Sequence, residues 1–152
     1  MIRKMYIINK SGVCIYHIDF SIFQVNDEKN QNQDAQLIGG FFTAMDSFAS
    51  TAVKSTQKLR SIVLTDIIYY FHNERKRIYV LETDSLNKNM FHEDYVDILK
   101  EISTLFDDII LQENDDDLIM DVDNAEFTEE VKHIVSKNVK KSLFKNTVSQ
   151  PT

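Results

Sequence analysis

The chain has 152 residues, which suits one domain, and its 43% hydrophobic and 27% charged residues are typical of a globular protein rather than a disordered one. A formal net charge of −7, from 24 acidic and 17 basic residues, argues against sequence-independent binding of nucleic acid and weakly against docking on anionic lipid by charge alone. The single cysteine excludes an intramolecular disulfide and a cysteine-rich zinc site.

The sequence lacks the signals of secretion and membrane insertion. The opening MIRKMYIINK has too short an apolar run for a signal peptide, and no run reaches the roughly 18–20 apolar residues that span a bilayer. Neither end carries a lipidation motif. We therefore expect a cytoplasmic protein with a single domain over residues 1–145 and a short flexible tail over residues 146–152.

The first part of the chain predicts two strands, a loop and a helix. β-Branched and aromatic runs over 4–9 and 13–19 are joined by NKSG, in which Gly12 can take the positive φ of a hairpin turn. The polar stretch that follows, richest in Asn, Gln, Asp and Glu over 26–36, predicts a long loop.

Two neighbouring apolar rows then follow helical spacing, so the predicted helix has a wider apolar surface than a surface helix shows. We expect this helix to be covered on more than one side. The first row is Leu37, Phe41, Ala44, Phe48 and Ala52, and the second is Ile38, Phe42, Met45 and Ala49.

The second part of the chain predicts three strands and two helices. Helical spacing covers about 91–111 and 125–144, with Asn124 as the N-cap of the later helix. The strand signals are apolar almost continuously, which predicts a sheet covered on both faces. They lie at 59–65, 67–73 and 77–83.

The resulting order is β-β-α-β-β-β-α-α. The strands are mostly joined by short connections, so we expect one five-stranded antiparallel sheet. Three amphipathic helices remain to cover it, which predicts an α+β fold with a three-layer α-β-α sandwich.

This order, together with three stretches, resembles the longin domain of the longin/roadblock superfamily. The stretches are MYIINKSGVCIYH, LIGGFFTAMDSFAS and LRSIVLTDIIYYFHNERKRIYVLETD. The sequence looks most like stand-alone longin-type proteins of archaea, over residues 1–111 and by element order beyond them. It starts directly in a strand, whereas the roadblock fold carries a helix before its first strand.

The resemblance implies a non-enzymatic protein-interaction module without a cofactor. Such domains commonly pair with themselves or with a related longin/roadblock subunit, often through the first helix and the edge strand after it. The pairs form scaffolds or regulator platforms for small Ras-like GTPases and vesicle-trafficking complexes. Any association with membranes would then be peripheral and through partners.

Seven residues are our candidates for such an interface. The apolar ones would bury surface between subunits, the two adjacent glycines would allow close approach of a backbone, and Asp46 would lie at the rim. The alternative for the glycines is that the helix presses on the chain's own sheet. The candidates are Gly39, Gly40, Phe42, Met45, Asp46, Ile62 and Leu64.

No constellation in the sequence predicts catalysis or metal binding. Cys14 lies in an apolar strand, and no GxxxxGK[ST] phosphate loop is present. The acidic stretch 113–123 lacks the spacing and the glycine of an EF-hand. Arg60, Arg75 and Arg77 are candidates by exposure for an arginine finger. The other polar residues considered are His17, His72, His92, His133, Asp115, Asp117, Asp121 and Asp123.

The second functional class considered is a small-molecule sensor. A cavity between the sheet and the second and third helices could hold an apolar ligand. It would be lined by Tyr69, Tyr70, Phe71 and Tyr79, although these aromatic residues are more typical of a core.

Overall fold

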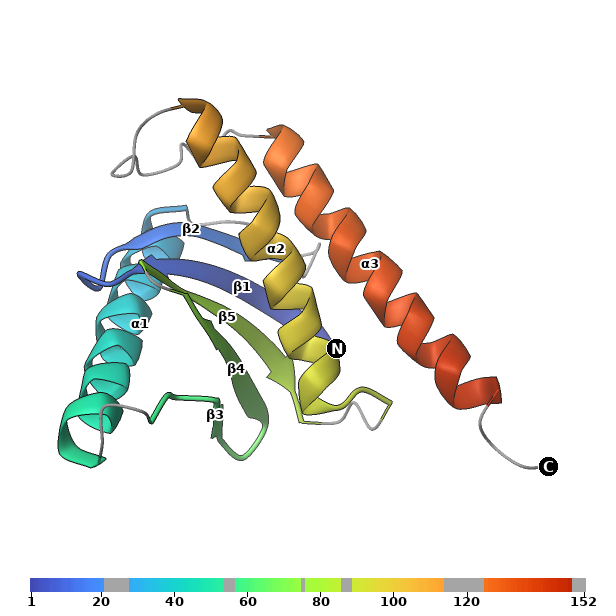
Figure 1. The fold of residues 1–152 in the computed structure, drawn as a ribbon, viewed down its shortest axis with the longest axis horizontal. Coiled ribbons are helices and arrows are strands. Elements are labelled where there is room, and N and C mark those ends of the chain that lie inside the picture. The colour runs from blue at the N-terminus through green and yellow to red at the C-terminus, as the bar shows by residue number, and fades with distance from the viewer. Residues whose placement is uncertain (21–27, 54–56, 75, 86–88, 114–124, 149–152) are drawn as a thin grey trace.

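The computed structural model describes residues 1–20, 28–53, 57–74, 76–85, 89–113 and 125–148 (Figure 1). Its element order is the predicted one, with a π-helical turn η1 added after the first helix. The elements are β1 (Ile2–Asn9), β2 (Cys14–Asp19), α1 (Glu28–Phe48), η1 (Ala49–Val53), β3 (Ser61–Val63), β4 (Ile67–Asn73), β5 (Arg77–Asp84), α2 (His92–Glu113) and α3 (Ala125–Val148).

The five strands form one sheet in the order β2-β1-β5-β4-β3, and every neighbouring pair is antiparallel. The predicted antiparallel sheet is therefore confirmed. Gly12 has a φ of 94° in the β1–β2 turn, as the hairpin prediction requires.

Helices cover both faces of the sheet, which confirms the three-layer prediction (Figure 1). Because side chains alternate along a strand, Met5 and Ile7 of β1 face α2 and α3, whereas Tyr6 and Ile8 face α1. Every residue of the central strand β5 from Arg77 to Thr83 is buried. At the edge, Ser61 and Val63 of β3 are exposed, so the expectation of full cover on both faces is wrong for β3.

Helix α1 begins at Glu28, well before the predicted start at Leu37. The prediction of a loop is therefore wrong for residues 28–36, while residues 21–27 lie outside the described part. Glu, Lys, Gln and Ala form helices readily, but this polar stretch has no apolar periodicity to reveal one.

The later helices agree closely with their predicted bounds. Helix α2 matches the expected 91–111, and α3 continues to Val148, into the stretch predicted as a tail. The predicted N-cap Asn124 and the acidic residues Asp115, Asp117, Asp121 and Asp123 lie outside the described residues.

Candidate interaction surface on helix α1 and strand β3

One row of α1 packs into the chain's own core. Ala35, Gly39, Phe42 and Asp46 are buried at successive helical turns. Phe42 is only 2% exposed, and its ring meets the rings of Tyr69 and Phe71 edge-on, with centroids 4.9 Å apart in each pair. This inner row fixes α1 against the sheet.

Gly39 allows α1 to approach the β1–β2 hairpin. A Cβ atom at this position would lie 2.8 Å from the carbonyl oxygen of Gly12 and 3.4 Å from the backbone nitrogen of Cys14. The neighbouring Gln36 amide donates to the carbonyl of Cys14 at 2.9 Å and accepts from its N–H at 3.0 Å. The close approach that Gly39 permits is thus within this chain.

Asp46 joins α1 to two turns of the sheet. Its carboxylate accepts a hydrogen bond of 2.7 Å from the Asn73 side chain and lies 3.7 Å from the Lys10 ammonium. Lys10 also donates to the side-chain oxygen of Asn73. Asp46 is 7% exposed, so it is a buried link between α1, the β1–β2 turn and the end of β4, not a residue at a surface rim.

A second row of α1 faces solvent. Leu37, Phe41 and Phe48 are 73%, 56% and 64% exposed, and Ala44 between them is exposed as well. This outer row, defined here as Leu37, Phe41, Ala44 and Phe48, is two residues out of step with the inner row. Two residues turn the helix by about 200°, so the two rows lie on opposite sides.

Gly40 lies beside the outer row and faces open space. Apart from its chain neighbours and the backbone of its own helix, no atom lies within 4 Å of the position that its Cβ would take. Gly40 and Ala44 are one turn apart, so they form a low patch between the larger side chains of the outer row. Another backbone can approach α1 closely at this patch.

Strand β3 leaves hydrogen-bonding groups at the open edge of the sheet. Phe71 N–H donates to the Arg60 carbonyl, and Leu64 N–H donates to the Ile67 carbonyl. The alternation of an antiparallel pair then turns the N–H and C=O groups of Ser61 and Val63 away from β4. Val63 and Leu64 are 69% and 51% exposed, so this edge is also apolar.

The structure separates the seven sequence candidates into buried, half-buried and exposed residues. Gly39, Phe42 and Asp46 serve contacts inside the chain, and Met45 is half-buried. Gly40 and Leu64 are exposed, and Ile62 is half-buried against the same core cluster as Phe42. The exposed residues of the outer row were not among the candidates, although the sequence contains their spacing.

Comparison with protein-family models gives a match to the Sybindin-like family over residues 2–138, most of the chain. The chain belongs to the Sybindin-like family. This family has a fold of the longin/roadblock type, so the predicted resemblance is confirmed. No curated protein matches this chain.

Two solved structures show a limited likeness to this Sybindin-like chain. The gliding protein MglB from Thermus thermophilus is 14% identical, with 66% of this chain and 70% of that chain covered and a TM-score of 0.44. MglB in a tetrameric arrangement is 13% identical, with the same coverage and TM-score.

The Cys14 thiol of this Sybindin-like protein is unsuited to nucleophilic catalysis. Cys14 is 3% exposed, and burial raises the pKa of its thiol to about 11. The thiol therefore stays protonated near neutral pH, whereas a nucleophile needs the thiolate.

Ser103, His72 and Glu74 come together in the fold, but not in the arrangement of a nucleophile and its base. The Ser103 hydroxyl donates to Glu74 at 2.9 Å, and the same carboxylate oxygen lies 3.0 Å from His72 Nε2. Burial alone would raise the pKa of Glu74, but the hydrogen bonds from His72 and Ser103 and the charge of Arg77 lower it. This cluster ties the β4–β5 hairpin to α2.

Arg77 is not the exposed hairpin residue that the sequence suggested. It is 8% exposed, donates to Asp107 at 2.9 Å and lies over the Phe106 ring, 4.9 Å from its centroid. Arg77 is therefore wrong as an exposed arginine finger. Arg60 is exposed, and Arg75 lies outside the described residues.

The aromatic residues considered for a ligand cavity point to opposite faces of the sheet. Tyr69 and Phe71 pack under α1, whereas Tyr70 and Tyr79 pack under α2. The ring of Tyr70 stacks on the ring of Tyr95, with the two centroids 4.3 Å apart. They do not line one cavity, so this feature of the sensor hypothesis is wrong.

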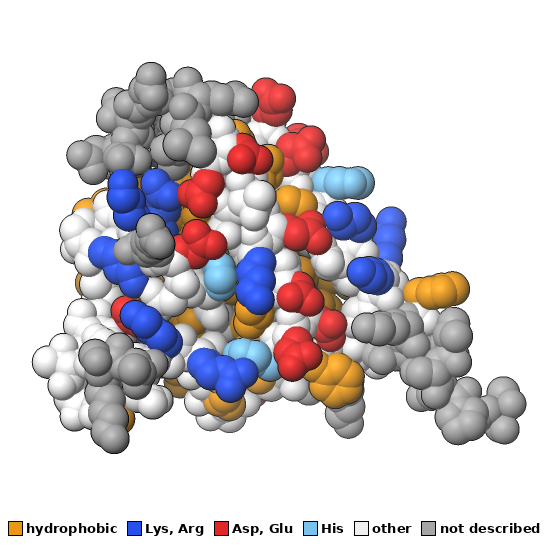
Figure 2. Space-filling model, in the orientation of Figure 1, with side chains coloured by type: hydrophobic (Ala, Val, Ile, Leu, Met, Phe, Trp, Pro, Cys, Tyr) orange, Lys and Arg blue, Asp and Glu red, His pale blue; other side chains and the backbone are white. Residues whose placement is uncertain are grey.

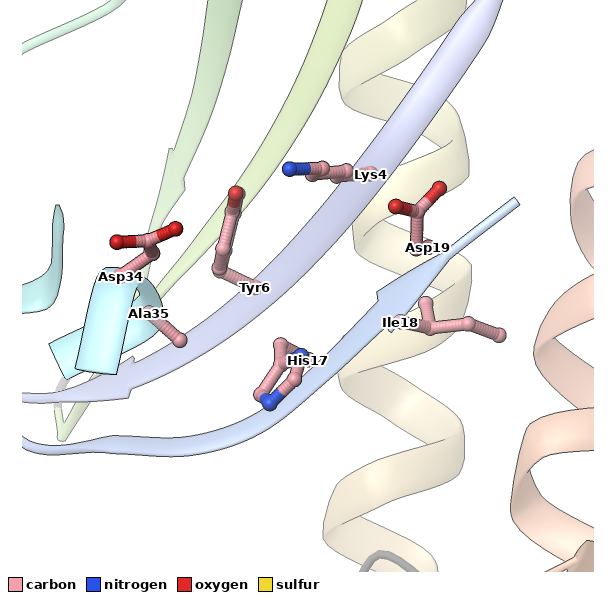
Figure 3. Close-up of a pocket in the computed structure, with 7 residues that line it drawn as sticks. All are labelled: Lys4, Tyr6, His17, Ile18, Asp19, Asp34 and Ala35. Carbon is pink, nitrogen blue, oxygen red and sulfur yellow. The ribbon is translucent and has the colours of Figure 1, made fainter. Parts of the chain in front are cut away.

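The hollows on the described surface include a small pit and an open groove. A pit of about 30 Å³, which suits about one water molecule, lies between β1, β2 and the start of α1, where Lys4, Tyr6 and Asp34 point toward one another (Figure 3). An open groove of about 370 Å³ beside α2 is lined by Arg60, Lys100 and the acidic Glu93 and Asp97, among others.

Two further expectations concern metals and membranes. Among the described residues, no group of three or more His, Cys, Asp or Glu side chains is placed to hold a metal ion. In the same part of the chain, every helix is too short or too polar to cross a membrane.

Proposed function

We propose that this Sybindin-like protein is a non-enzymatic interaction module that pairs, through α1 and β3, with a second copy or a related longin/roadblock subunit. The observation that carries the proposal is the outer row of α1. Leu37, Phe41 and Phe48 line up on one side of the helix, and each is more than half exposed. Large apolar side chains aligned in this way are typical of a protein–protein contact.

The low patch at Gly40 and Ala44 supports a helix-to-helix contact. Two α1 helices that cross at this patch can bring their backbones close, while Phe41 and Phe48 pack on either side of the crossing. An isologous contact of this kind uses the same surface on both subunits. In this proposal the two glycines serve different contacts, because Gly39 allows α1 to approach the β1–β2 hairpin and Gly40 allows a second subunit to approach.

The outer row alone is too small for a stable pair, which is why the proposal includes β3. A phenylalanine buries roughly 150–250 Å² at most, whereas a stable interface takes roughly 800 Å² from each partner. Val63 and Leu64 add exposed apolar surface, and the outward groups of Ser61 and Val63 can pair with a partner strand.

We extend this proposal to a role for the pair as a scaffold or regulator platform for a small Ras-like GTPase in vesicle trafficking. Membership in the Sybindin-like family is consistent with a GTPase-regulating module of the longin type. In such a platform the exposed Arg60 would be the remaining described candidate to contact the nucleotide.

The pairing is tested by light scattering of the wild type and of a Phe41→Ser, Phe48→Ser variant. We expect a dimer for the wild type and a folded monomer for the variant. The matched control is Phe91→Ser, Phe144→Ser, which removes two phenylalanines that are at least as exposed and lie away from α1. A monomeric wild type at high concentration would overturn self-pairing, and loss of the dimer in the control would overturn the assignment to α1.

The GTPase role needs a separate experiment. Small Ras-like GTPases from the same genome, loaded with GDP or with a non-hydrolysable GTP analogue, are titrated into the protein in a calorimeter. We expect one of them to bind with a preference for one nucleotide state. Absence of binding by all of them would overturn the platform role and leave the pairing untouched.

A further inference from the structure

The end of the chain differs in charge from everything before it. Between Val131 and Thr152 the sequence has five lysines and neither aspartate nor glutamate. The preceding residues carry all 24 acidic side chains and 12 of the 17 basic ones. The net charge of −7 is therefore the sum of an acidic first part and a basic segment at the end. This basic segment occupies the greater part of α3.

Helix α3 keeps its apolar row inside and its lysines outside. Phe127 and Val131 are fully buried, and the ring of Phe127 meets the ring of Tyr16 edge-on at 4.8 Å. On the outer side, Lys132, Ser136, Lys140 and Phe144 are exposed and follow one another at intervals of four residues. Lys137 and Lys141 form a neighbouring exposed row, nearer to α2.

The C-terminal end of α3 also carries exposed apolar side chains. Phe144 and Leu143 are 73% and 46% exposed. The Ser142 hydroxyl donates to the carbonyl of Asn89 at 3.0 Å, which brings this end of α3 beside the start of α2, where Phe91 is 69% exposed. Figure 2 shows lysine side chains gathered over α3 and a hydrophobic side chain near its C-terminal end.

Acidic residues on α2 reduce the charge on one side of this basic end. Lys137 lies 3.2 Å from Glu101, and Lys141 shares a small hollow with Asp94 and Asp97. Lys132 lies 3.4 Å from Glu129, in a pair where both side chains are more than half exposed. Exposed pairs of this kind contribute little to stability, so the lysines can exchange these partners for an anionic surface.

We propose that the basic end of α3, defined as Lys137, Lys140, Lys141 and Phe144 with the adjacent Phe91, docks directly on an anionic membrane surface. Lysine ammonium groups attract anionic headgroups without fixed geometry, whereas the fork of an arginine suits a defined site. Phenylalanine side chains beside them enter the boundary between headgroups and acyl chains. An acidic protein segment would use the lysines but leaves the two exposed aromatic rings without a role.

The binding is tested by flotation with vesicles of phosphatidylcholine and of phosphatidylcholine mixed with phosphatidylglycerol. We expect binding to the anionic vesicles only, weakened by salt. Lys137→Glu, Lys140→Glu, Lys141→Glu should weaken it by about a hundredfold or more, since each surface lysine contributes about fivefold to the binding constant. The matched control Lys58→Glu, Lys76→Glu, Lys100→Glu makes the same charge change at exposed lysines elsewhere and should bind as the wild type does.

Three results of the flotation would overturn the proposal. They are absence of binding, equal binding to both kinds of vesicle, and equal loss in the two triple variants. Salt-sensitive binding to soluble polyglutamate without binding to vesicles would assign the lysines to an acidic polypeptide instead, and would also overturn it.

A second measurement reports on Phe144 itself. The chain has no tryptophan, so Phe144→Trp introduces a single fluorescent reporter at the proposed membrane contact. We expect its emission to shift to the blue with phosphatidylglycerol vesicles, while a Phe41→Trp reporter on α1 stays unchanged. A shift at Phe41 alone would overturn the proposal. Neither outcome depends on whether α1 forms a dimer.

Discussion

A methyl group added at Gly39 and one added at Gly40 meet different surroundings. At Gly39 it would lie 2.8 Å from the Gly12 carbonyl oxygen, and at Gly40 it would meet nothing within 4 Å. Both glycines lie inside α1, where alanine is favoured over glycine by about 0.5–1 kcal/mol.

We expect Gly39→Ala to lower the free energy of unfolding and Gly40→Ala to raise it. Overpacking costs typically about 1–3 kcal/mol, which outweighs the helix preference at Gly39. Within one protomer only the helix preference acts at Gly40, so the expected gain is up to about 1 kcal/mol when unfolding is measured in the Phe41→Ser, Phe48→Ser background, which removes the proposed pairing. Urea unfolding of the two variants at equal concentration checks the signs, and an increase for both would show that the hairpin moves to accommodate the methyl group at Gly39.

Residue type alone did not predict where the Arg77 side chain lies. In the sequence it ends the charged stretch HNERKR, which is typical of a solvated turn. In the fold the chain turns its guanidinium inward, onto the Phe106 ring and Asp107 of α2. The pairing depends on where α2 crosses the hairpin, and local sequence does not contain that information.

At the scale of elements, a substitution in β3 can test the proposed pairing without disturbing the fold of the protomer. The Val63 N–H points away from β4, whereas the Ile62 N–H faces Tyr69 in the ladder. Proline lacks this hydrogen and is tolerated at the outer side of an edge strand. We expect Val63→Pro to weaken self-association of the otherwise wild-type chain, and to leave the unfolding midpoint in urea nearly unchanged in the monomeric Phe41→Ser, Phe48→Ser background.

The control for this test is Ile62→Pro. It removes a ladder hydrogen bond and displaces a half-buried side chain, so we expect it to cost up to about 3 kcal/mol in the free energy of unfolding. If Val63→Pro destabilises the protein as much as Ile62→Pro does, the outward direction of the Val63 N–H is contradicted. If Val63→Pro keeps full self-association, β3 has no part in the interface.

Hydrophobic periodicity predicted most elements, and there is a physical reason why it missed the first part of α1. Strands and helices with apolar rows were found because burial imposes their spacing. The first turns of α1 are polar, so only the general preference of Glu, Lys and Gln for helices marks them. Periodicity also revealed two neighbouring apolar rows on α1, one with Phe41 and one with Phe42, but since both are apolar it did not show which of the two phenylalanines the sheet covers. The choice of Phe42 over Phe41 therefore lay beyond the sequence.

At the scale of the whole molecule, the three-layer architecture places the two proposed interaction surfaces on opposite sides of the sheet. Strands β1 and β5 at the centre carry the core, α1 presents its outer row on one side of the sheet, and the basic end of α3 lies on the other (Figure 1). A module built in this way can pair through one surface while the other stays free. The two proposals are therefore compatible in one molecule.

Pairing also makes a prediction about thermal stability. If unfolding separates two protomers, a tenfold rise in protein concentration stabilises each protomer by about 0.7 kcal/mol, half of the roughly 1.4 kcal/mol that corresponds to a factor of ten. For a chain of this size that raises the Tm by about 2 °C. The Phe41→Ser, Phe48→Ser variant should show a Tm independent of concentration, because its unfolding involves one chain. Calorimetric scans of both proteins across a roughly hundredfold range of concentration check this prediction. The expected rise in the Tm of the wild type over that range is about 4 °C. A wild-type Tm as constant as that of the variant would contradict pairing through α1.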